Sequence, residues 1–315
     1  MAELGGEPPW IEQISWKPRA QVYHNFLTPQ VRSFRDLGGP HRGRGGCETR
    51  PGNTDGASPS PVASCAALTA GRAAHPVFPL SQECDHLINL AAPHMTKSSV
   101  VDRVTGKSMA SKVRTSTGHF LRRNEDPIVT RIEERIAAFS MVPADHGEGM
   151  QVLHYTAGQK YEPHYDYFQD PVNVKGVGQR VATVLMYLSD VEEGGETVFP
   201  KGTFVHGDEG TPSYDHQREL SNRPGTSKCA LGKLHVKPRR GDALLFWSTS
   251  LNGHEDEASL HGGCPVGRGD KWTATKWIRV GPGRDSEKER EVKERIQKER
   301  EERVRRGEDI DPDEW

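Results

Sequence analysis

A histidine and an aspartate near the middle of the chain have the spacing of a metal-binding pair. His164 and Asp166 lie within QVLHYTAGQKYEPHYDYF, residues 151–168. Residues i and i+2 of a β-strand project from the same face, so a strand here would direct both side chains at one metal ion. A third ligand must come from a distant part of the chain, and His261 is the candidate.

The His-x-Asp spacing alone does not select this pair, because it occurs twice more. The rival pairs are His206 with Asp208 and His254 with Asp256. The first lies in a stretch rich in Gly, Asp and Pro, and the second lies in a polar segment just before His261. Neither stretch has a strand pattern that would hold two ligands rigidly, so we expect both to be surface loops. The pair at 164 and 166 is instead followed by enough strands to bring His261 alongside.

Two imidazoles and one carboxylate form a ligand set that leaves coordination positions open. On an octahedral iron, the open positions can take a chelating co-substrate and dioxygen. Zinc accepts the same three side chains, so the residues alone leave the metal open. A hydrogen-bonded His–Asp pair without a metal is the alternative interpretation of His164 and Asp166.

A lysine follows the third candidate ligand at the start of an apolar strand. Lys271 lies ten residues after His261. Strand alternation groups Lys271, Thr273, Thr275, Trp277 and Arg279 on one face, and Trp272, Ala274, Ile278 and Val280 with Lys276 on the other. A lysine on an interior face needs an anionic partner, which a dicarboxylate ligand would provide. The alternative is a lysine at a strand end that extends to solvent.

The elements that must position these residues are mostly strands. Two helices are predicted, at 83–92 and after Asp126 and Pro127, where Ile128, Ile132 and Ile136 recur at helical spacing. Short β-rich segments separated by Gly, Pro or charged turns are predicted at 21–27, 100–121, 180–189, 196–199, 234–238, 243–248 and 271–280. Such a series favours an antiparallel sandwich or jelly roll in an α+β chain.

Composition divides the chain into segments. Residues 1–15 are expected to be unstructured, and the Gly-, Pro-, Arg- and Ser-rich stretch 31–82 is expected to be a disordered insert in a domain at 16–280. Residues 281–315 alternate Glu with Lys and Arg, which favours a solvated helix ending near Gly307 over a docking helix.

Charge and hydropathy argue against a nucleic-acid partner and against a membrane-spanning segment. Lys plus Arg number 42 against 44 Asp plus Glu, a net charge of -2, so no nucleic-acid partner is expected. No stretch of the chain has the continuous apolar length of a membrane span, and the opening residues have no signal-peptide pattern. The five cysteines are too few and too scattered for a disulfide scaffold.

Four motifs together strongly resemble the catalytic domain of plant and algal prolyl 4-hydroxylases. They are HYTAGQKYEPHYDYF, RVATVLMYLSDVEEGGETVFP, VKPRRGDALLFW and SLHGGCPVGRGDKWTATKWIRV. The resemblance covers about 16–27 and 83–280. It implies iron ligands at His164, Asp166 and His261, and Lys271 at the distal carboxylate of 2-oxoglutarate. It also implies that Tyr155 supports that carboxylate, and that Thr183 and Trp277 line the same pocket.

The family resemblance implies a fold and a reaction. The fold is a double-stranded β-helix, or jelly roll, with supporting N-terminal helices. The reaction is hydroxylation of peptidyl proline at C4 with dioxygen and 2-oxoglutarate, releasing succinate and CO₂, with Fe(II) and ascorbate. A proline-rich substrate in polyproline II form would suit a groove lined by aromatics such as Tyr161 and Trp277. The alternatives are a dioxygenase acting on another peptide residue and a non-catalytic metal-binding jelly roll.

Two features depart from the family pattern. Family members usually begin with a membrane anchor and enter the endoplasmic reticulum and secretory pathway, so we expect this N-terminus to be an incomplete or alternative start. Family sequences also join the equivalents of Gln30 and Glu83 directly, and the insert Val31–Gln82 is either a retained intron or a real surface loop. A Cys229–Cys264 disulfide would agree with an oxidising lumen.

Overall fold

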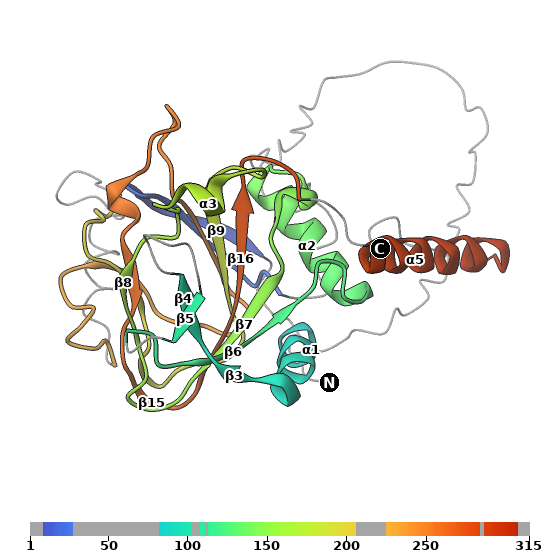
Figure 1. Ribbon diagram of the computed structural model, residues 1–315. Helices are drawn as coiled ribbons and strands as arrows, with labels where there is room; N and C mark the ends of the chain where they lie inside the picture. The colour runs from blue at the N-terminus through green and yellow to red at the C-terminus, as the bar shows by residue number, and fades with distance from the viewer. Residues whose placement is uncertain are drawn as a thin grey trace, which may run out of the picture.

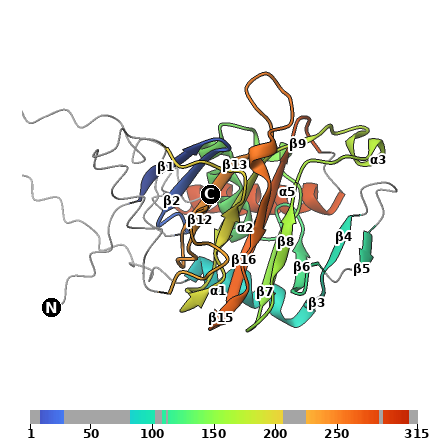
Figure 2. The same ribbon diagram turned by 90° about the vertical axis from the view of Figure 1, so that its left-hand side faces the viewer.

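The computed structural model describes residues 9–27, 82–101, 108–110, 113–205, 225–283 and 287–307. In these residues an eight-stranded antiparallel sheet, here called the major sheet, packs against a four-stranded antiparallel sheet, the minor sheet. Helices cover the other side of the major sheet (Figures 1 and 2). The α+β jelly roll predicted from the series of short strands is therefore confirmed.

The major sheet has the order β1-β2-β13-β9-β16-β7-β6-β3, and the minor sheet has the order β12-β11-β14-β8. The major strands are β1 (Trp10–Trp16), β2 (Arg19–His24), β3 (Thr96–Lys97), β6 (Thr117–Leu121), β7 (Met150–Tyr155), β9 (Arg180–Tyr187), β13 (Ala243–Trp247) and β16 (Lys271–Arg279). The minor strands are β8 (Tyr161–His164), β11 (Thr197–Phe199), β12 (Leu234–Val236) and β14 (His261–Gly263).

Two small ribbons and four described α-helices complete the fold. The ribbons pair β4 (Ser99–Val101) with β5 (Ser108–Ala110), and β10 (Glu193–Gly194) with β15 (Val266–Arg268). The α-helices are α1 (Gln82–Ala91), α2 (Pro127–Ser140), α3 (Pro171–Val174) and α5 (Glu287–Arg305). Among the described residues, none of the helices has both the length and the apolar character of a membrane crossing.

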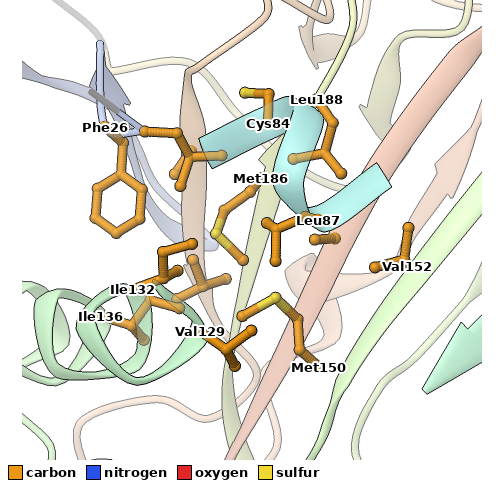
Figure 3. Packing of buried hydrophobic residues seen from close by; sticks show 14 of the residues in the cluster. Phe26, Cys84, Leu87, Val129, Ile132, Ile136, Met150, Val152, Met186 and Leu188 are labelled. Atoms are coloured by element: carbon orange, nitrogen blue, oxygen red, sulfur yellow. The ribbon is translucent and has the colours of Figure 1, made fainter. Parts of the chain in front are cut away.

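Helix α2 begins and ends where its sequence directs. The Asp126 carboxylate accepts a hydrogen bond from the Val129 backbone N–H at 2.8 Å, and Pro127 takes the first helical turn, as predicted. The helix ends at Met141, whose φ of 57° is left-handed. Its buried Ile132 and Ile136 pack with α1 and the major sheet in the main hydrophobic core (Figure 3). Each such fully buried side chain contributes about 1.5–3 kcal/mol.

Strand β16 separates the hydrophobic core from the interior between the two sheets. Its Ala274 and Ile278 belong to the helix-side core, with Trp272 packed against it. Lys271, Thr273, Thr275 and Trp277 line a cavity on the opposite side. The alternation predicted for this strand is therefore confirmed, and it places Lys271 in the interior.

The N-terminal segment differs from the sequence-based expectation. Residues Trp10–Trp16 were expected to lie largely in an unstructured region, but they form β1, which pairs with β2. Ile14 and Ser15 are buried, and the Ser15 hydroxyl donates to the Thr203 carbonyl at 2.6 Å. The reason is tertiary: burial against the minor sheet compensates a weak strand pattern.

Two other predicted segments fall partly outside the described residues. The predicted insert 31–82 lies outside them except for Gln82, which begins α1. Both interpretations of this insert, a retained intron and a surface loop, therefore stay predictions. The charged tail contains α5, as its composition predicts, with a turn at Gly307.

A histidine bridge joins β2 to the two neighbouring strands. His24 contacts the Asp242 carboxylate at 2.7 Å and the Glu12 carboxylate at 3.1 Å. Burial opposes protonation, but hydrogen bonds to the two carboxylates raise the pKa of His24 to about 9. A histidine with a raised folded pKa stabilises the fold fully below its unfolded pKa of 6.5 and loses that contribution as pH rises through about 9.

We expect the free energy of unfolding to fall by roughly 1–2 kcal/mol between pH 6.5 and 9 because of His24. Urea unfolding curves of the wild type and of His24→Gln at several pH values measure this. The variant should lack this part of the decline, whereas His254→Gln, which alters an exposed histidine, should behave as wild type. Equal slopes in wild type and His24→Gln would refute the assignment.

Candidate metal centre and its pocket

Three predicted ligand residues meet between the two sheets. One ligand atom from each of His164, Asp166 and His261 can be chosen so that all lie within 4.8 Å of one another. The Asp166 carboxylate lies 3.6 Å from His164 Nε2 and 3.5 Å from His261 Nε2. Among the described residues, this is the group of His, Cys, Asp and Glu side chains with metal-site spacing.

The strand register brings the two histidines together. On adjacent strands β8 and β14, His164 and His261 are direct antiparallel partners. A Cβ at Gly262 would lie 3.0 Å from the Tyr161 carbonyl oxygen, so glycine permits the close approach of these strands. Both histidines were predicted as ligands from the sequence, but the register that makes them direct partners is a finding of the structure.

Both imidazoles are oriented by backbone carbonyls. His164 Nδ1 lies 2.9 Å from the Glu162 carbonyl oxygen, and His261 Nδ1 lies 2.9 Å from the Ser259 carbonyl oxygen. A carbonyl can only accept, so each Nδ1 carries the proton and each Nε2 has a lone pair facing the carboxylate. Burial lowers the pKa of His261 to about 4, which keeps its ring neutral and able to bind a metal.

Asp166 is held differently from the sequence-based expectation. Strand β8 ends at His164, so Asp166 lies just beyond the strand and strand alternation does not set its direction. Its Oδ2 instead accepts a hydrogen bond from the Thr183 hydroxyl at 2.6 Å. Thr183 lines the cavity as predicted, and its hydroxyl fixes the carboxylate.

The rival His-x-Asp pairs do not form such a group where they are described. His254 is exposed, and the Asp256 carboxylate accepts from the Ala258 backbone N–H at the start of a short 3-10 turn. Asp256 therefore caps a turn. The pair His206 and Asp208 lies outside the described residues.

An inner cavity of about 50 Å³ adjoins the triad. Lys271 is only 4% exposed, and its ammonium makes no hydrogen bond or ion pair with any other described residue. The hydroxyl of Thr273 also faces this cavity, is buried and has no partner. A buried ammonium and a buried hydroxyl without partners fit an anionic ligand, because either group left unsatisfied is costly.

Tyr155 lies beside Lys271. The two residues are antiparallel partners on β7 and β16, and the Lys271 ammonium lies 5.6 Å from the centre of the Tyr155 ring. Tyr155 is buried and lines the inner cavity. Its position therefore fits a residue that supports a ligand carboxylate near Lys271.

A larger cleft of about 350 Å³ opens from the triad toward solvent. Tyr161, Trp277, His164, Asp166 and Arg114 line both the cleft and the inner cavity. The Tyr161 ring stacks on the His164 ring at a centroid distance of 3.6 Å. The two aromatics expected in a substrate groove are thus both placed at the junction between the two cavities.

Sequence reasoning missed two arginines in the cleft wall. Arg114 is 5% exposed, donates to the Gln151 side chain at 2.9 Å and lies over the Tyr161 ring. Arg180 makes a two-point contact with Glu148 and lies 4.0 Å above the Trp277 ring. Surface arginines are common, so neither had a signal in the sequence apart from its place near a predicted strand.

A disulfide links the turn before β12 to the residue that follows β14. Cys229 and Cys264 are bonded with a Cα–Cα distance of 5.8 Å. Cys264 comes directly after β14, the strand that carries His261. The possible pairing considered from the sequence is thus present in the structure.

Known proteins resemble this chain in sequence. The family model of the 2OG-Fe(II) oxygenase superfamily matches residues 150–279. "Probable prolyl 4-hydroxylase 3" from Arabidopsis thaliana is 49% identical over 272 residues, covering 86% of this chain and 73% of the relative. "Prolyl 4-hydroxylase 5" from the same plant is 45% identical over 280 residues, covering 88% and 74%.

Among solved structures, the viral collagen prolyl hydroxylase of Paramecium Bursaria Chlorella virus-1 in complex with 2OG is similar at 27% sequence identity. The match covers 63% of this chain and 90% of that protein, with a TM-score of 0.43.

Proposed function

Because the chain belongs to the prolyl 4-hydroxylase family of 2-oxoglutarate-dependent iron oxygenases, we propose that its triad and inner cavity form the active site of a peptidyl-proline 4-hydroxylase. The enzyme uses dioxygen to hydroxylate proline at C4 while 2-oxoglutarate becomes succinate and CO₂. One oxygen atom enters proline and the other enters succinate, so the reaction balances without a further reductant. Ascorbate is proposed as an accessory that keeps the iron reduced.

One observation carries the assignment of roles within the site. His164, Asp166 and His261 converge next to a cavity that contains a buried lysine without a counter-ion among the described residues. We assign the three side chains to iron and Lys271 to the distal carboxylate of 2-oxoglutarate. Iron, when bound, supplies the redox centre at which dioxygen and 2-oxoglutarate react.

The protein residues orient and enclose the reactants. Thr183 holds the Asp166 carboxylate, and the carbonyls of Glu162 and Ser259 hold the two imidazoles with Nε2 facing inward. Lys271 donates to the distal carboxylate, with the Thr273 hydroxyl as a second donor and Tyr155 beside it. Burial of this end of the cavity excludes water and strengthens each charge-assisted hydrogen bond.

The outer cleft suits an extended, proline-rich peptide. Its wall contains Tyr161, Tyr165, Tyr167, Phe168 and Trp277. Flat aromatic walls pack well against pyrrolidine rings, and a polyproline II segment is already extended, so little conformational entropy is lost on binding. We therefore propose that the substrate proline enters from this cleft, with its C4 directed toward the triad.

The disulfide supports a proposal about the compartment. A Cys229–Cys264 bond is stable in oxidising compartments and rare in reducing ones. This supports the proposal that the enzyme works in the endoplasmic reticulum or a later part of the secretory pathway. We also propose that residues 16–280 form a single catalytic domain, interrupted at 31–82 and followed by the charged tail 281–315.

The function is tested by supplying the full chain with Fe(II), 2-oxoglutarate, ascorbate and a proline-rich peptide. Mass spectrometry should show the peptide gaining one oxygen atom, and fragmentation should place that atom on proline. Succinate should form in proportion. A metal-loaded, folded enzyme that produces neither succinate nor hydroxyproline from such peptides would contradict the proposal.

Lys271→Met is expected to raise the Michaelis constant for 2-oxoglutarate by about 30-fold or more. Loss of one member of a buried hydrogen-bonded charge pair costs about 2 kcal/mol or more, which corresponds to that factor. Succinate release measured against 2-oxoglutarate concentration provides the value. Lys97→Met alters an exposed lysine on β3 and serves as the matched control. An unchanged 2-oxoglutarate requirement in Lys271→Met would remove this lysine from its assigned role.

A further inference from the structure

A buried carboxylate close to Lys271 has no part in the site described above. Glu196 lies between Gly195 and Thr197, immediately before β11, and is fully buried. Thr197 lines the inner cavity, whereas Glu196 does not. Because Thr197 is in the cavity lining and Glu196 is not, the Glu196 carboxylate lies behind the cavity wall.

The Glu196 carboxylate is fixed by hydrogen bonds but is not neutralised by a cation. Its two oxygens accept from the Ser227 backbone N–H at 2.8 Å and from the Ser227 hydroxyl at 2.7 Å. Within the described ranges it forms no ion pair. Burying a negative charge without a cationic partner is costly, and the two hydrogen bonds from Ser227 offset part of that cost.

On the other side of the same wall, Lys271 is a buried positive charge that forms no ion pair with any other described residue. Its side-chain stem lies against this segment, since a Cβ at Gly195 would be 3.4 Å from Lys271 Cδ. Its ammonium faces the rings of Tyr155 and Tyr187, at 5.6 and 6.0 Å from their centres. Burial lowers the pKa of Lys271 to about 8, and the negative charge of Glu196 opposes this lowering.

We propose that Glu196 is a positioning residue for the co-substrate, which keeps the ammonium of Lys271 charged and ready for 2-oxoglutarate without touching it. This inference rests on the proposed function, in which Lys271 binds the distal carboxylate. Glu196 does not line the cavity that the dicarboxylate would occupy, so it acts on the ammonium of Lys271 and makes no contact with the ligand. Its attraction for the ammonium therefore exceeds its repulsion of the ligand.

The disulfide supports the carboxylate from two directions. Cys229 follows the Ser227 turn closely, and the Cys264 backbone N–H donates to the Glu196 carbonyl at 2.8 Å. The covalent bond between these cysteines therefore joins the turn that holds the carboxylate to the strand segment that holds its backbone. This arrangement keeps a charged side chain at one position in the interior, where its field on Lys271 is constant.

The other titratable groups near Lys271 come from several elements. Tyr155 faces it from β7 and Tyr187 from β9. The remaining titratable residues of the cavity are Arg114, Tyr161, His164, Asp166 and His261. Burial raises the pKa of Tyr187, which is therefore uncharged in the pH range of interest. Glu196 is thus the group whose removal should act on Lys271 through charge alone.

The test measures binding of 2-oxoglutarate to the full chain by calorimetry, without oxygen and with Mn(II) in place of iron. A fixed charge several ångströms away in a protein interior shifts a pKa by on the order of one unit. Glu196→Gln should therefore weaken binding about fivefold at pH 8 and shift the decline in affinity to lower pH. At pH 6.5, where the lysine is largely protonated in both proteins, the two affinities should converge. Glu196→Asp, which keeps the charge, should recover most of the loss.

A second background separates this inference from the proposed function. In Lys271→Met, adding Glu196→Gln should produce no further loss of affinity, because the carboxylate acts through the lysine. An equal effect of Glu196→Gln in both backgrounds, or no effect in the wild type, overturns the inference. If Lys271→Met alone binds 2-oxoglutarate as the wild type does, the assignment of the lysine fails first, and that result is visible without any Glu196 variant.

Ser227→Ala is a milder variant that tests the inference if Glu196→Gln does not fold. Ser227→Ala removes the hydroxyl donor but keeps the backbone N–H and the carboxylate. The less tightly fixed charge should weaken 2-oxoglutarate binding about threefold at pH 8, which is the size of one net hydrogen bond. If Glu196→Gln does not fold by near-ultraviolet circular dichroism, Ser227→Ala decides, and wild-type affinity at every pH in that variant counts against the proposal.

Discussion

Replacing His261 with alanine is expected to abolish succinate release and proline hydroxylation. Loss of a hydrogen-bond partner of a metal ligand already costs roughly 10–100-fold in affinity or activity, and loss of the ligand itself should exceed this range. His261 is 7% exposed and lies against the Phe246 ring, so no neighbouring side chain can replace its Nε2. The variant retains Asp166 and His164, which alone make a weaker and less rigid site.

Three measurements check this expectation. Succinate release and peptide oxidation report turnover, and the iron content of the purified protein after dialysis reports binding. His254→Ala is the matched control, because His254 belongs to an identical His-x-Asp pattern but lies on an exposed loop. Wild-type turnover by His261→Ala would exclude it from the metal centre. Loss of activity in His254→Ala would show that the wrong pair had been chosen.

Replacing Glu133 with alanine is expected to destabilise the fold by about 3–5 kcal/mol. This carboxylate forms a buried ion pair with the ammonium of Lys276, and both side chains are at most 3% exposed. It also accepts a hydrogen bond from the Asn124 backbone N–H at 2.9 Å. Removal of one member leaves an uncompensated buried charge, which is among the most destabilising single changes in a protein interior.

The double variant Glu133→Met with Lys276→Met gives the opposite contrast. Apolar side chains of similar volume can replace a buried pair at little loss of stability, so the double variant should be more stable than either single variant. Urea denaturation of the wild type, Glu133→Met, Lys276→Met and the double variant measures the coupling free energy between the two residues. Arg135→Met would not serve as a control, because its guanidinium pairs with Glu83 at 2.7 Å. Lys97→Met, on the exposed β3, is suitable, and additive effects of the two main changes would rule out the predicted coupling.

The parts of the fold that could be predicted from the sequence depend on local patterns. The cap at Asp126 and the alternation along β16 are both written in neighbouring residues, and both are present in the structure. The β1 strand was missed because its stability comes from its pairing with β2 and burial of Ile14, not from its own composition. Long-range pairing has no local signature.

The site shows the same division. The residue types of the triad and the position of Lys271 could be predicted, since metal ligation and a buried lysine each make strong chemical demands. The support of Asp166 by Thr183 could not, because Asp166 lies beyond β8 and the contact joins separate strands. Glu196 gave no signal either, since a glutamate next to a strand is ordinarily a surface residue.

The direct pairing of His164 with His261 across β8 and β14 also has a consequence for how the protein matures. The two strands are far apart in the chain, and β14 lies between β11 and β8 in the folded sheet. An unfolded chain therefore offers no assembled site, so we expect tight iron binding to require that these long-range contacts have formed. Once bound, the ion acts as a clip between two distant strands and shifts the folding equilibrium toward the native state, so iron supply also bears on how long each molecule remains folded.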